Sequence, residues 1–173
     1  MRTPEELYRA FQKGDREAFA EIVATYRESV IHFLYRYVSN LDDAEDLAED
    51  TFVAVLEHPH RFRFSCSLRS YLFAIARNKA LHHLRKHRNI VPLEYEEQLV
   101  SPTVSPEERL IFKEQLEQVL GLPEKYRMAL LLTAVDGLSY AEAATVLGVN
   151  EKQIKNLCYR ARQRLLAEGG VTV

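Results

Sequence analysis

Four short patterns mark the beginnings of helices in this sequence. In each, a small polar residue is followed three positions later by Glu or Gln, and the two side chains can satisfy free backbone N–H groups at a helix N-terminus. The pairs are Thr3/Glu6, Ser105/Glu108, Ser139/Glu142 and Asn150/Gln153. Patterns typical of β-strands are nearly absent. The sequence therefore predicts an all-α protein.

Apolar residues in the first half of the chain recur at helical spacing. This periodicity predicts three helices, at about residues 15–38, 42–57 and 67–85. The second has an apolar face suited to a core and acids on the opposite face. The third is apolar nearly all round, which is typical of a helix held between others.

The helical periodicity fails over residues 91–104, which contain Pro92, Pro102 and three acids. We interpret this segment as part of an extended linker. A second helical group then runs from Pro106 to about Glu168. The prediction is two small helical domains and a linker, with boundaries at residues 1–90, 91–105 and 106–173.

The net charge of −2 conceals a strong segregation of charge along the chain. Between Val38 and His60 there are seven acids and no Lys or Arg, whereas between Arg61 and Arg88 there are eight Lys or Arg residues and no acid. Charge counted in blocks, rather than in total, indicates which partner each segment prefers. The small net charge therefore does not exclude a nucleic-acid partner.

Residues 139–166 have the pattern of a helix-turn-helix, in which two short helices are joined by a tight turn. Gly148 suits the turn, and Asn150 can cap the second helix. The predicted inner face of the second helix consists of Ile154, Cys158, Ala161 and Leu165. Such a unit commonly lies in a DNA groove.

The outer face of this second helix carries cations and amides. Because the N-terminal residues of such a helix normally reach the bases, the candidates for base readout are Lys152, Gln153, Lys155 and Asn156. Tyr159 can also donate a hydrogen bond, and the candidates for contacts to phosphates are Arg160, Arg162 and Arg164. The alternative is a helical hairpin with a solvated basic face.

Two separate parts of the chain carry longer motifs. The first part comprises DDAEDLAEDTF (42–52) and FAIARNKALHHLRKHRN (73–89). The second comprises LPEKYRMALLL (122–132) and DGLSYAEAATVLGVNEKQIKNLCYRARQRL (136–165). In this order they resemble the extracytoplasmic-function (ECF) sigma factors of bacterial RNA polymerase. The resemblance covers most of the chain and implies a factor that binds core polymerase and directs promoter-specific initiation.

The resemblance implies a polymerase-docking face on the helix at residues 42–57. In the family, the matching helix docks on the clamp helices of the largest catalytic subunit. An acidic face with an exposed apolar residue suits a basic, partly apolar coiled coil. The implied docking residues are Asp42, Asp46, Glu49, Asp50 and Val53. A solvated acidic face is the alternative.

The resemblance also implies that residues 61–88 recognise and open the promoter −10 element. Holding an opened strand requires cations along its backbone and polar or aromatic walls around an extruded base. By analogy, the loop from Phe64 to Arg69 and the side chain of Asn78 form the base pocket. The implied contacts are Arg61, Arg63, Phe64, Arg69, Tyr71, Arg77, Asn78, Lys79, Arg85, Lys86 and Arg88. Ordinary core positions are the alternative for the aromatic residues, and a packed polar position is the alternative for Asn78.

The resemblance implies that the helix-turn-helix reads the −35 element and that the linker threads the polymerase cleft. There the acids Glu94, Glu96 and Glu97 could imitate a nucleic-acid backbone, although a solvated acidic tether fits the sequence equally well. The chain departs from the common family pattern at Glu49, Tyr71, His82, Ala143 and Leu157. Because His82 and Leu157 lie near DNA-facing segments, the promoter sequence cannot be transferred from relatives.

Other chemistries are disfavoured. His83 and His87 have a spacing that can bind zinc, but Lys and Arg surround them. The acids at residues 42–50 spread over a wide arc of a helix instead of converging on a metal. We therefore expect no metal, no cofactor and no enzymatic activity. The competing interpretations are a DNA-binding regulator that never joins polymerase and a helical adaptor.

Cysteine usage and hydropathy indicate where the chain acts. The two cysteines, Cys66 and Cys158, lie far apart in sequence, which favours a reducing cytosol over a disulfide scaffold. No run of eighteen apolar residues is present, so no membrane span is expected. We expect a cytoplasmic protein whose partners are core RNA polymerase, promoter DNA and an anti-sigma factor, the last being usual in the family.

Overall fold

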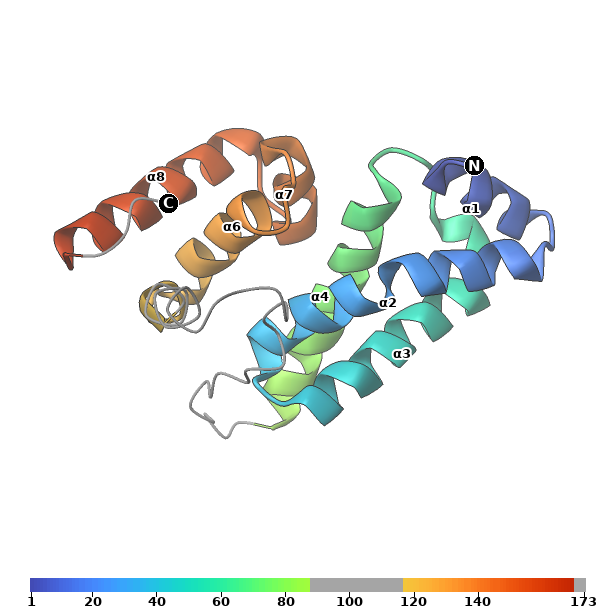
Figure 1. Ribbon diagram of the computed structural model, residues 1–173, viewed down its shortest axis with the longest axis horizontal. Helices are drawn as coiled ribbons and strands as arrows, with labels where there is room; N and C mark the ends of the chain where they lie inside the picture. The colour runs from blue at the N-terminus through green and yellow to red at the C-terminus, as the bar shows by residue number, and fades with distance from the viewer. Residues whose placement is uncertain (88–116, 170–173) are drawn as a thin grey trace. The chain divides into compact units, whose positions relative to one another are not determined.

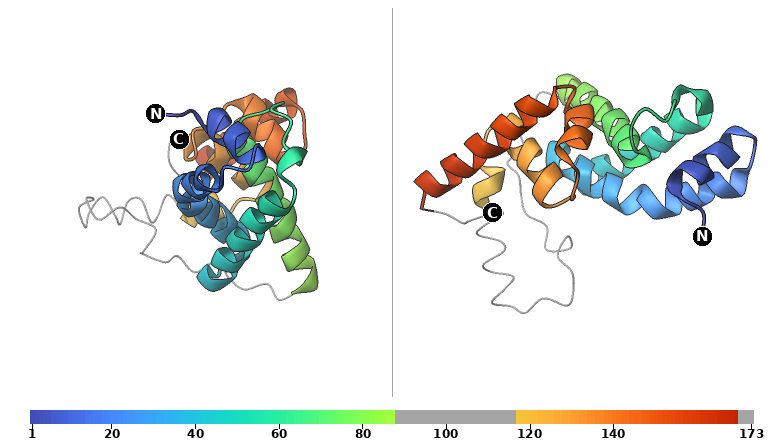
Figure 2. Two further views of the ribbon diagram at one scale, coloured as in Figure 1. Left: turned by 90° about the vertical axis from the view of Figure 1, so that its right-hand side faces the viewer. Right: turned by 90° about the horizontal axis from the view of Figure 1, so that it is seen from above.

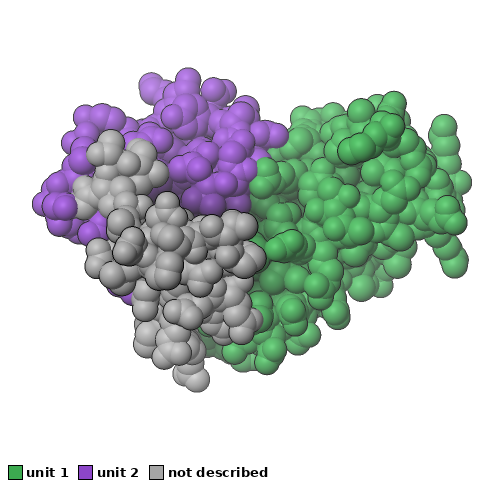
Figure 3. Space-filling view, in the orientation of Figure 1, with its two compact units in different colours: residues 1–92 green, residues 93–173 purple. Residues whose placement is uncertain are grey.

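The computed structural model describes residues 1–87 and 117–169, and every regular element in these ranges is a helix. The predicted all-α fold class is therefore confirmed. The chain divides into two compact units, residues 1–92 and 93–173, which Figure 3 shows in different colours. The predicted linker and the predicted Ser105/Glu108 cap lie outside the described residues. None of the described helices combines the length and the hydropathy needed to cross a membrane.

Within residues 1–87, the first unit consists of α-helices and one short 3₁₀ helix (Figures 1 and 2). The elements are α1 (Pro4–Gln12), α2 (Arg16–Val38), α3 (Leu41–Glu57), η1 (Pro59–Arg61) and α4 (Leu68–Lys86). The long helix α2 contacts α1, α3 and α4, and α3 also contacts α4. Helix α3 runs back along α2 in the opposite direction (Figure 1).

Side-chain caps determine where these helices begin. Asp15, Asn40 and Ser67 each accept a hydrogen bond from a backbone N–H group in the first turn of α2, α3 and α4. The capping box predicted at Thr3/Glu6 is complete at the start of α1. Each cap satisfies a donor that would otherwise lack a partner in the helix, and a cap contributes about 1 kcal/mol.

The core of the first unit is rich in aromatic side chains. Tyr8, Phe33 and Phe73 are fully buried, and the rings of Phe33 and Phe73 stack with their centroids 4.6 Å apart. Burying one large apolar side chain contributes roughly 1.5–3 kcal/mol. The predicted core face of α3 is confirmed by the burial of Ala44, Leu47, Ala48, Phe52 and Val55.

Helix α4 is only partly covered by its neighbours. It buries Leu68, Leu72 and Phe73, whereas other apolar residues, Ile75, Leu81 and Leu84, are only half-buried. The helix expected to be held between others therefore packs against α2 and α3, while part of its apolar surface stays accessible.

The second unit contains a helical turn at residues 117–120, followed by α6 (Glu124–Ala134), α7 (Tyr140–Leu147) and α8 (Glu151–Ala167). Helices α7 and α8 form the predicted helix-turn-helix, and both begin with the predicted capping boxes. Gly148 ends α7 at a φ of 66°, a left-handed conformation that favours glycine.

The inner face of α8 packs against α6 and α7 as predicted. Ile154, Cys158, Ala161 and Leu165 are all buried. The Sγ atom of Cys158 lies 3.5 Å from the carbonyl oxygen of Ala129 in α6, so this thiol is a small core group. Because the inner face is fixed, the opposite face of α8 is turned to solvent.

Candidate polymerase and nucleic-acid interfaces

One face of α3 is acidic and solvent-exposed. We call it the acidic face and define it by the predicted docking residues Asp42, Asp46, Glu49, Asp50 and Val53, all of which are exposed. Val53 exposes 48% of its surface and so adds an apolar side chain to this face. Because the opposite face of α3 fills the core, the helical period turns these five side chains outward.

An apolar groove lies beside the acidic face, between α2 and α3. It has a volume of about 330 Å³ and is lined by Phe19, Val23, Arg27, Glu49, Phe52, Val53 and Leu56. Leu56 is 50% exposed. The sequence patterns did not single out Phe19, Val23 or Leu56 as functional. A usable signal was the i, i+3 pair Val53 and Leu56, two apolar residues on a helix whose outer face is otherwise acidic.

The loop at residues 58–67 joins α3 to α4 and carries three of the predicted −10 contacts. We call it the recognition loop. Arg61 and Arg63 are exposed, and Phe64 is half-buried. The buried Phe62 ring lies 4.6 Å from the Phe64 ring and 4.8 Å from the Tyr71 ring, between centroids. The rings thus pack as a cluster, which agrees with the alternative interpretation of these aromatic residues as core positions. Phe64 and Tyr71 nevertheless keep part of their surface accessible.

The predicted −10 contacts on α4 differ in exposure. Asn78, Arg85 and Lys86 are exposed, whereas the more enclosed ones, Arg69, Arg77 and Lys79, are half-buried. The exposure of Asn78 argues against the alternative interpretation, in which its side chain occupies a packed polar position. The Arg69 guanidinium lies 5.3 Å from the centroid of the Phe73 ring. The remaining predicted contact, Arg88, lies outside the described residues.

A second, larger groove runs between α3 and α4. Its volume is about 590 Å³, and its lining includes the predicted −10 contacts Arg61, Asn78, Lys79 and Lys86. Asp50 of the acidic face also lines it. One predicted docking residue therefore faces the same groove as four predicted DNA contacts, an arrangement that periodicity alone did not reveal.

The histidines near the end of α4 contact Asp43 and one another. His83 Nε2 lies 3.4 Å from Asp43 Oδ2, and the rings of His83 and His87 stack 4.4 Å apart. In residues 1–87 and 117–169, no three His, Cys, Asp or Glu side chains are grouped so that they could hold a metal ion.

The predicted base-reading residues all lie on the exposed face of α8. Lys152, Gln153, Lys155 and Asn156 are exposed, and Tyr159 is 62% exposed. The side-chain oxygen of Gln153 accepts a hydrogen bond from the Asn150 backbone N–H at 2.9 Å. The amide NH₂ of Gln153 is thus the group that can donate to a base. Lys155 Nζ lies 3.6 Å from Glu151 Oε1, an exposed pair that DNA could readily displace.

The three predicted phosphate-binding arginines of α8 divide between two sides of the helix. Arg164 lies 4.7 Å from the centroid of the Tyr126 ring in α6, and a hydrogen bond from Arg160 lowers the pKa of the Tyr126 phenol. Arg162 is half-buried and lines a shallow hollow near Ser139. Arg160 and Arg164 therefore share one side, and Arg162 lies apart from them.

Known proteins match both units. The family model for Sigma-70 region 2 matches residues 22–90, and the model for Sigma-70 region 4 matches residues 114–165. The ECF RNA polymerase sigma factor SigM of Bacillus subtilis is 33% identical over 153 residues, covering 85% of this chain and 92% of SigM. The chain belongs to the ECF sigma factors. Another ECF sigma factor of this bacterium, SigW, is 29% identical over 168 residues, covering 89% of this chain and 90% of SigW.

Solved structures share the fold of this ECF sigma factor. The structure of CnrH in complex with the cytosolic domain of CnrY matches with a TM-score of 0.71 and 26% identity, covering 94% of each chain. The sigma factor RpoE in complex with the anti-sigma factor NepR from Bartonella quintana matches with a TM-score of 0.69 and 26% identity, covering 84% of this chain and 92% of RpoE. Helix α1 precedes the residues that the region 2 model matches.

Proposed function

We propose that this ECF sigma factor binds core RNA polymerase and directs promoter-specific initiation by recognising the −10 and −35 elements and aiding promoter opening. The observation that carries the proposal is the exposed acidic face on α3, with Val53 and an apolar groove beside it. A protein that bound only DNA would gain nothing from an anionic, partly apolar surface, because the phosphate backbone repels it. A basic, partly apolar protein partner fits it.

The proposed division of labour follows the chain. Residues 1–90 dock on polymerase and open the −10 element, residues 106–173 bind the −35 element, and residues 91–105 link them. Because both domains belong to one chain, engagement of the promoter by the first raises the effective concentration of the second. Both elements can then be bound tightly even if each unit alone binds weakly.

At the −10 element, the recognition loop and α4 supply different contacts. Exposed cations such as Arg61 and Lys86 can hold the phosphates of an opened strand, whereas Phe64 and Tyr71 offer ring surface to an extruded base. The exposed amide of Asn78 can pair with a base edge. We propose that these residues capture the strand after the duplex opens.

At the −35 element, the exposed face of α8 enters the major groove. Lys152, Lys155 and Asn156 lie near its N-terminus, where such helices contact base edges. Arg160 and Arg164 lie further along and contact phosphates, which sets the position of the helix without reading sequence.

We also propose an anti-sigma factor as a partner. The two structural relatives described above were solved as complexes, one with the cytosolic domain of CnrY and one with the anti-sigma factor NepR. An inhibitor that covers the acidic face and α8 together would block both polymerase and DNA. Competition between inhibitor and core polymerase supports this mode, whereas a stable ternary complex refutes it.

The proposed activity consists of binding alone. The chain makes and breaks no covalent bond and takes no cofactor, because the polymerase carries out the chemistry of RNA synthesis. Since core RNA polymerase and promoter DNA reside in the bacterial cytoplasm, we place the protein there.

Reconstituted transcription tests the proposal. Purified protein is added to core polymerase with linear templates randomised across the two promoter elements, and the transcripts are sequenced. We expect initiation at a fixed distance from a selected pair of sequence elements, with no such products from core polymerase alone. A chain that binds core polymerase but selects no sequence, or that binds DNA without core polymerase and never initiates, contradicts the proposal.

A further inference from the structure

The recognition loop adopts a conformation that its own sequence does not favour. Phe64 has a φ of 60°, in the left-handed region that bulky side chains rarely adopt. Such a residue keeps this conformation only when its surroundings hold it there. The far end of the loop is fixed by the start of α4, where Ser67 Oγ accepts a hydrogen bond from the Ser70 backbone N–H at 3.2 Å. The rest of the loop requires another support.

Helix α1 provides polar support through a single side chain. The Nε2 group of Gln12 donates hydrogen bonds to the carbonyl oxygens of Pro59 at 2.9 Å and Phe62 at 3.1 Å. Both hydrogens of one amide thus hold two carbonyls of the recognition loop. Because these residues are far apart in sequence, the contacts fix the loop against α1 and not merely against its neighbours.

Helix α1 also provides ring support. The fully buried Tyr8 ring lies 4.9 Å from the Phe62 ring and 6.0 Å from the Phe64 ring, both edge-to-face. On the next residue, the Arg9 guanidinium lies 4.1 Å from the centroid of the Phe64 ring. A cation over a ring face is attracted by the ring's quadrupole. Phe64 is therefore held by two successive side chains of α1.

We propose that α1 positions the recognition loop for base capture, with Tyr8, Arg9 and Gln12 as positioning residues. The inference rests on the proposed function, which assigns the extruded −10 base to this loop. An ordered pocket binds a base without first losing conformational freedom. In a disordered loop, the apparent affinity for the base is reduced by the fraction of molecules that are in the binding-competent conformation. Helix α1 thereby sets the strength and selectivity of −10 recognition without contacting DNA.

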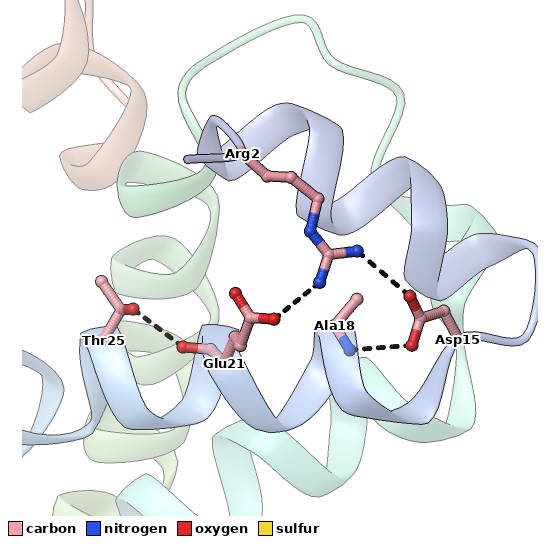
Figure 4. Close-up of polar contacts among 5 residues, drawn as sticks. All are labelled: Arg2, Asp15, Ala18, Glu21 and Thr25. Carbon is pink, nitrogen blue, oxygen red and sulfur yellow. Dashed lines mark hydrogen bonds and ion pairs between the residues drawn. The ribbon is translucent and has the colours of Figure 1, made fainter.

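Two variants of the full-length protein test the inference, Gln12→Met and Arg9→Met. Each removes a polar or charged contact to the loop and keeps a side chain of similar length. The matched control is Arg2→Met. Arg2 binds Asp15 Oδ2 at 3.1 Å and Glu21 Oε1 at 2.6 Å, so it ties the start of α1 to α2 without touching the loop (Figure 4). Arg9→Lys, which retains the cation, serves as the rescue variant.

The first readout is hydrogen–deuterium exchange of the free protein. We expect residues 61–67 to exchange roughly threefold to tenfold faster in Gln12→Met and Arg9→Met, in keeping with one or two lost contacts, while α2 and α3 are unchanged. Arg2→Met should leave the loop unchanged, and Arg9→Lys should restore much of its protection. Unaltered exchange in both loop variants overturns the inference, whatever the protein does in transcription.

The second readout is sequence selection by the reconstituted holoenzyme on the randomised templates. We expect Gln12→Met and Arg9→Met to lose roughly threefold to tenfold in preference at the −10 element, with the −35 preference and core-polymerase affinity unchanged. Faster loop exchange with full −10 selectivity overturns the positioning role. If the unmodified protein itself selects no promoter, the proposed function fails, and with it the proposal that α1 positions the loop for base capture. The exchange comparison still decides whether α1 holds the loop in place.

Discussion

At the residue scale, the phenol of Tyr126 in the second unit contacts two arginines of α8. Tyr126 is buried in α6, accepts the hydrogen bond that Arg160 donates and lies under the Arg164 guanidinium. The sequence predicted that these arginines are exposed on α8. It did not predict their common partner, because helical periodicity assigns faces within a helix and does not say which residue of another helix meets them.

This arrangement predicts a distinct tyrosine titration. The hydrogen bond from Arg160 lowers the pKa of Tyr126 below its ordinary value of 10.0. The associated stability is therefore fully present above pH 10 and is lost as the pH falls through the lowered pKa. Ultraviolet titration of the folded protein should show one early phenol that disappears in Tyr126→Phe and moves upward in Arg160→Met. An unchanged curve in Arg160→Met contradicts the assignment.

Asp15 gives a second prediction at this scale. Its pKa is lowered, first by the hydrogen bond from the Ala18 backbone N–H and then by Arg2 (Figure 4). A lowered carboxyl pKa contributes stability that is present above the ordinary value of 3.8 and is lost as the pH falls through the folded-state pKa. Thermal melts from pH about 6 to about 3 should therefore show a shallower loss of stability in Asp15→Asn.

The matched comparison for Asp15 is made in an Arg2→Met background. There the ion pair is already absent, so Asp15→Asn should change the pH dependence less than it does in the unmodified protein. Equal effects in both backgrounds would show that Arg2 contributes nothing to the titration of Asp15.

At the scale of elements, the sequence predicts helix starts better than helix environments. The predicted caps Thr3, Ser139 and Asn150 are local signals, and the helices begin directly after them. The support that α1 gives to the recognition loop was not predictable, because it depends on contacts between residues far apart in sequence. The partial exposure of α4 was not predictable for the same reason, since a sequence pattern shows which residues are apolar but not how much of the helix its neighbours cover.

The cap of α8 provides a test of this local signal. Asn150 forms a complete capping box with Gln153, with hydrogen bonds of 2.9 and 2.8 Å. We expect Asn150→Ala to lower the free energy of unfolding of the second unit by about 1 kcal/mol, and Asn150→Ser to lower it by only a few tenths. Denaturant unfolding measures both. Equal stabilities of the two variants would mean that the cap does not stabilise α8.

At the scale of the whole molecule, the account depends on charge segregated between surfaces. The sequence predicted this segregation from blocks of acids and bases, and the structure turns Asp46 and Glu49 of α3 and Lys155 of α8 outward. It did not predict the apolar groove beside Val53, which arises from the packing of α2 against α3. Such grooves depend on how side chains of two helices interlock, and a linear pattern does not encode that.

The most direct test is a pair of complementary double variants, measured for affinity to core polymerase and to −35 duplex DNA. Asp46→Lys with Glu49→Lys should weaken core binding tenfold or more, because like charges are then juxtaposed, while DNA affinity is kept or raised. Lys155→Ala with Arg160→Ala should leave core binding intact, weaken DNA binding and lower its salt slope by roughly one unit per lost phosphate contact. If either pair impairs both affinities equally, or if the first pair leaves core binding unchanged, the separation of surfaces is contradicted.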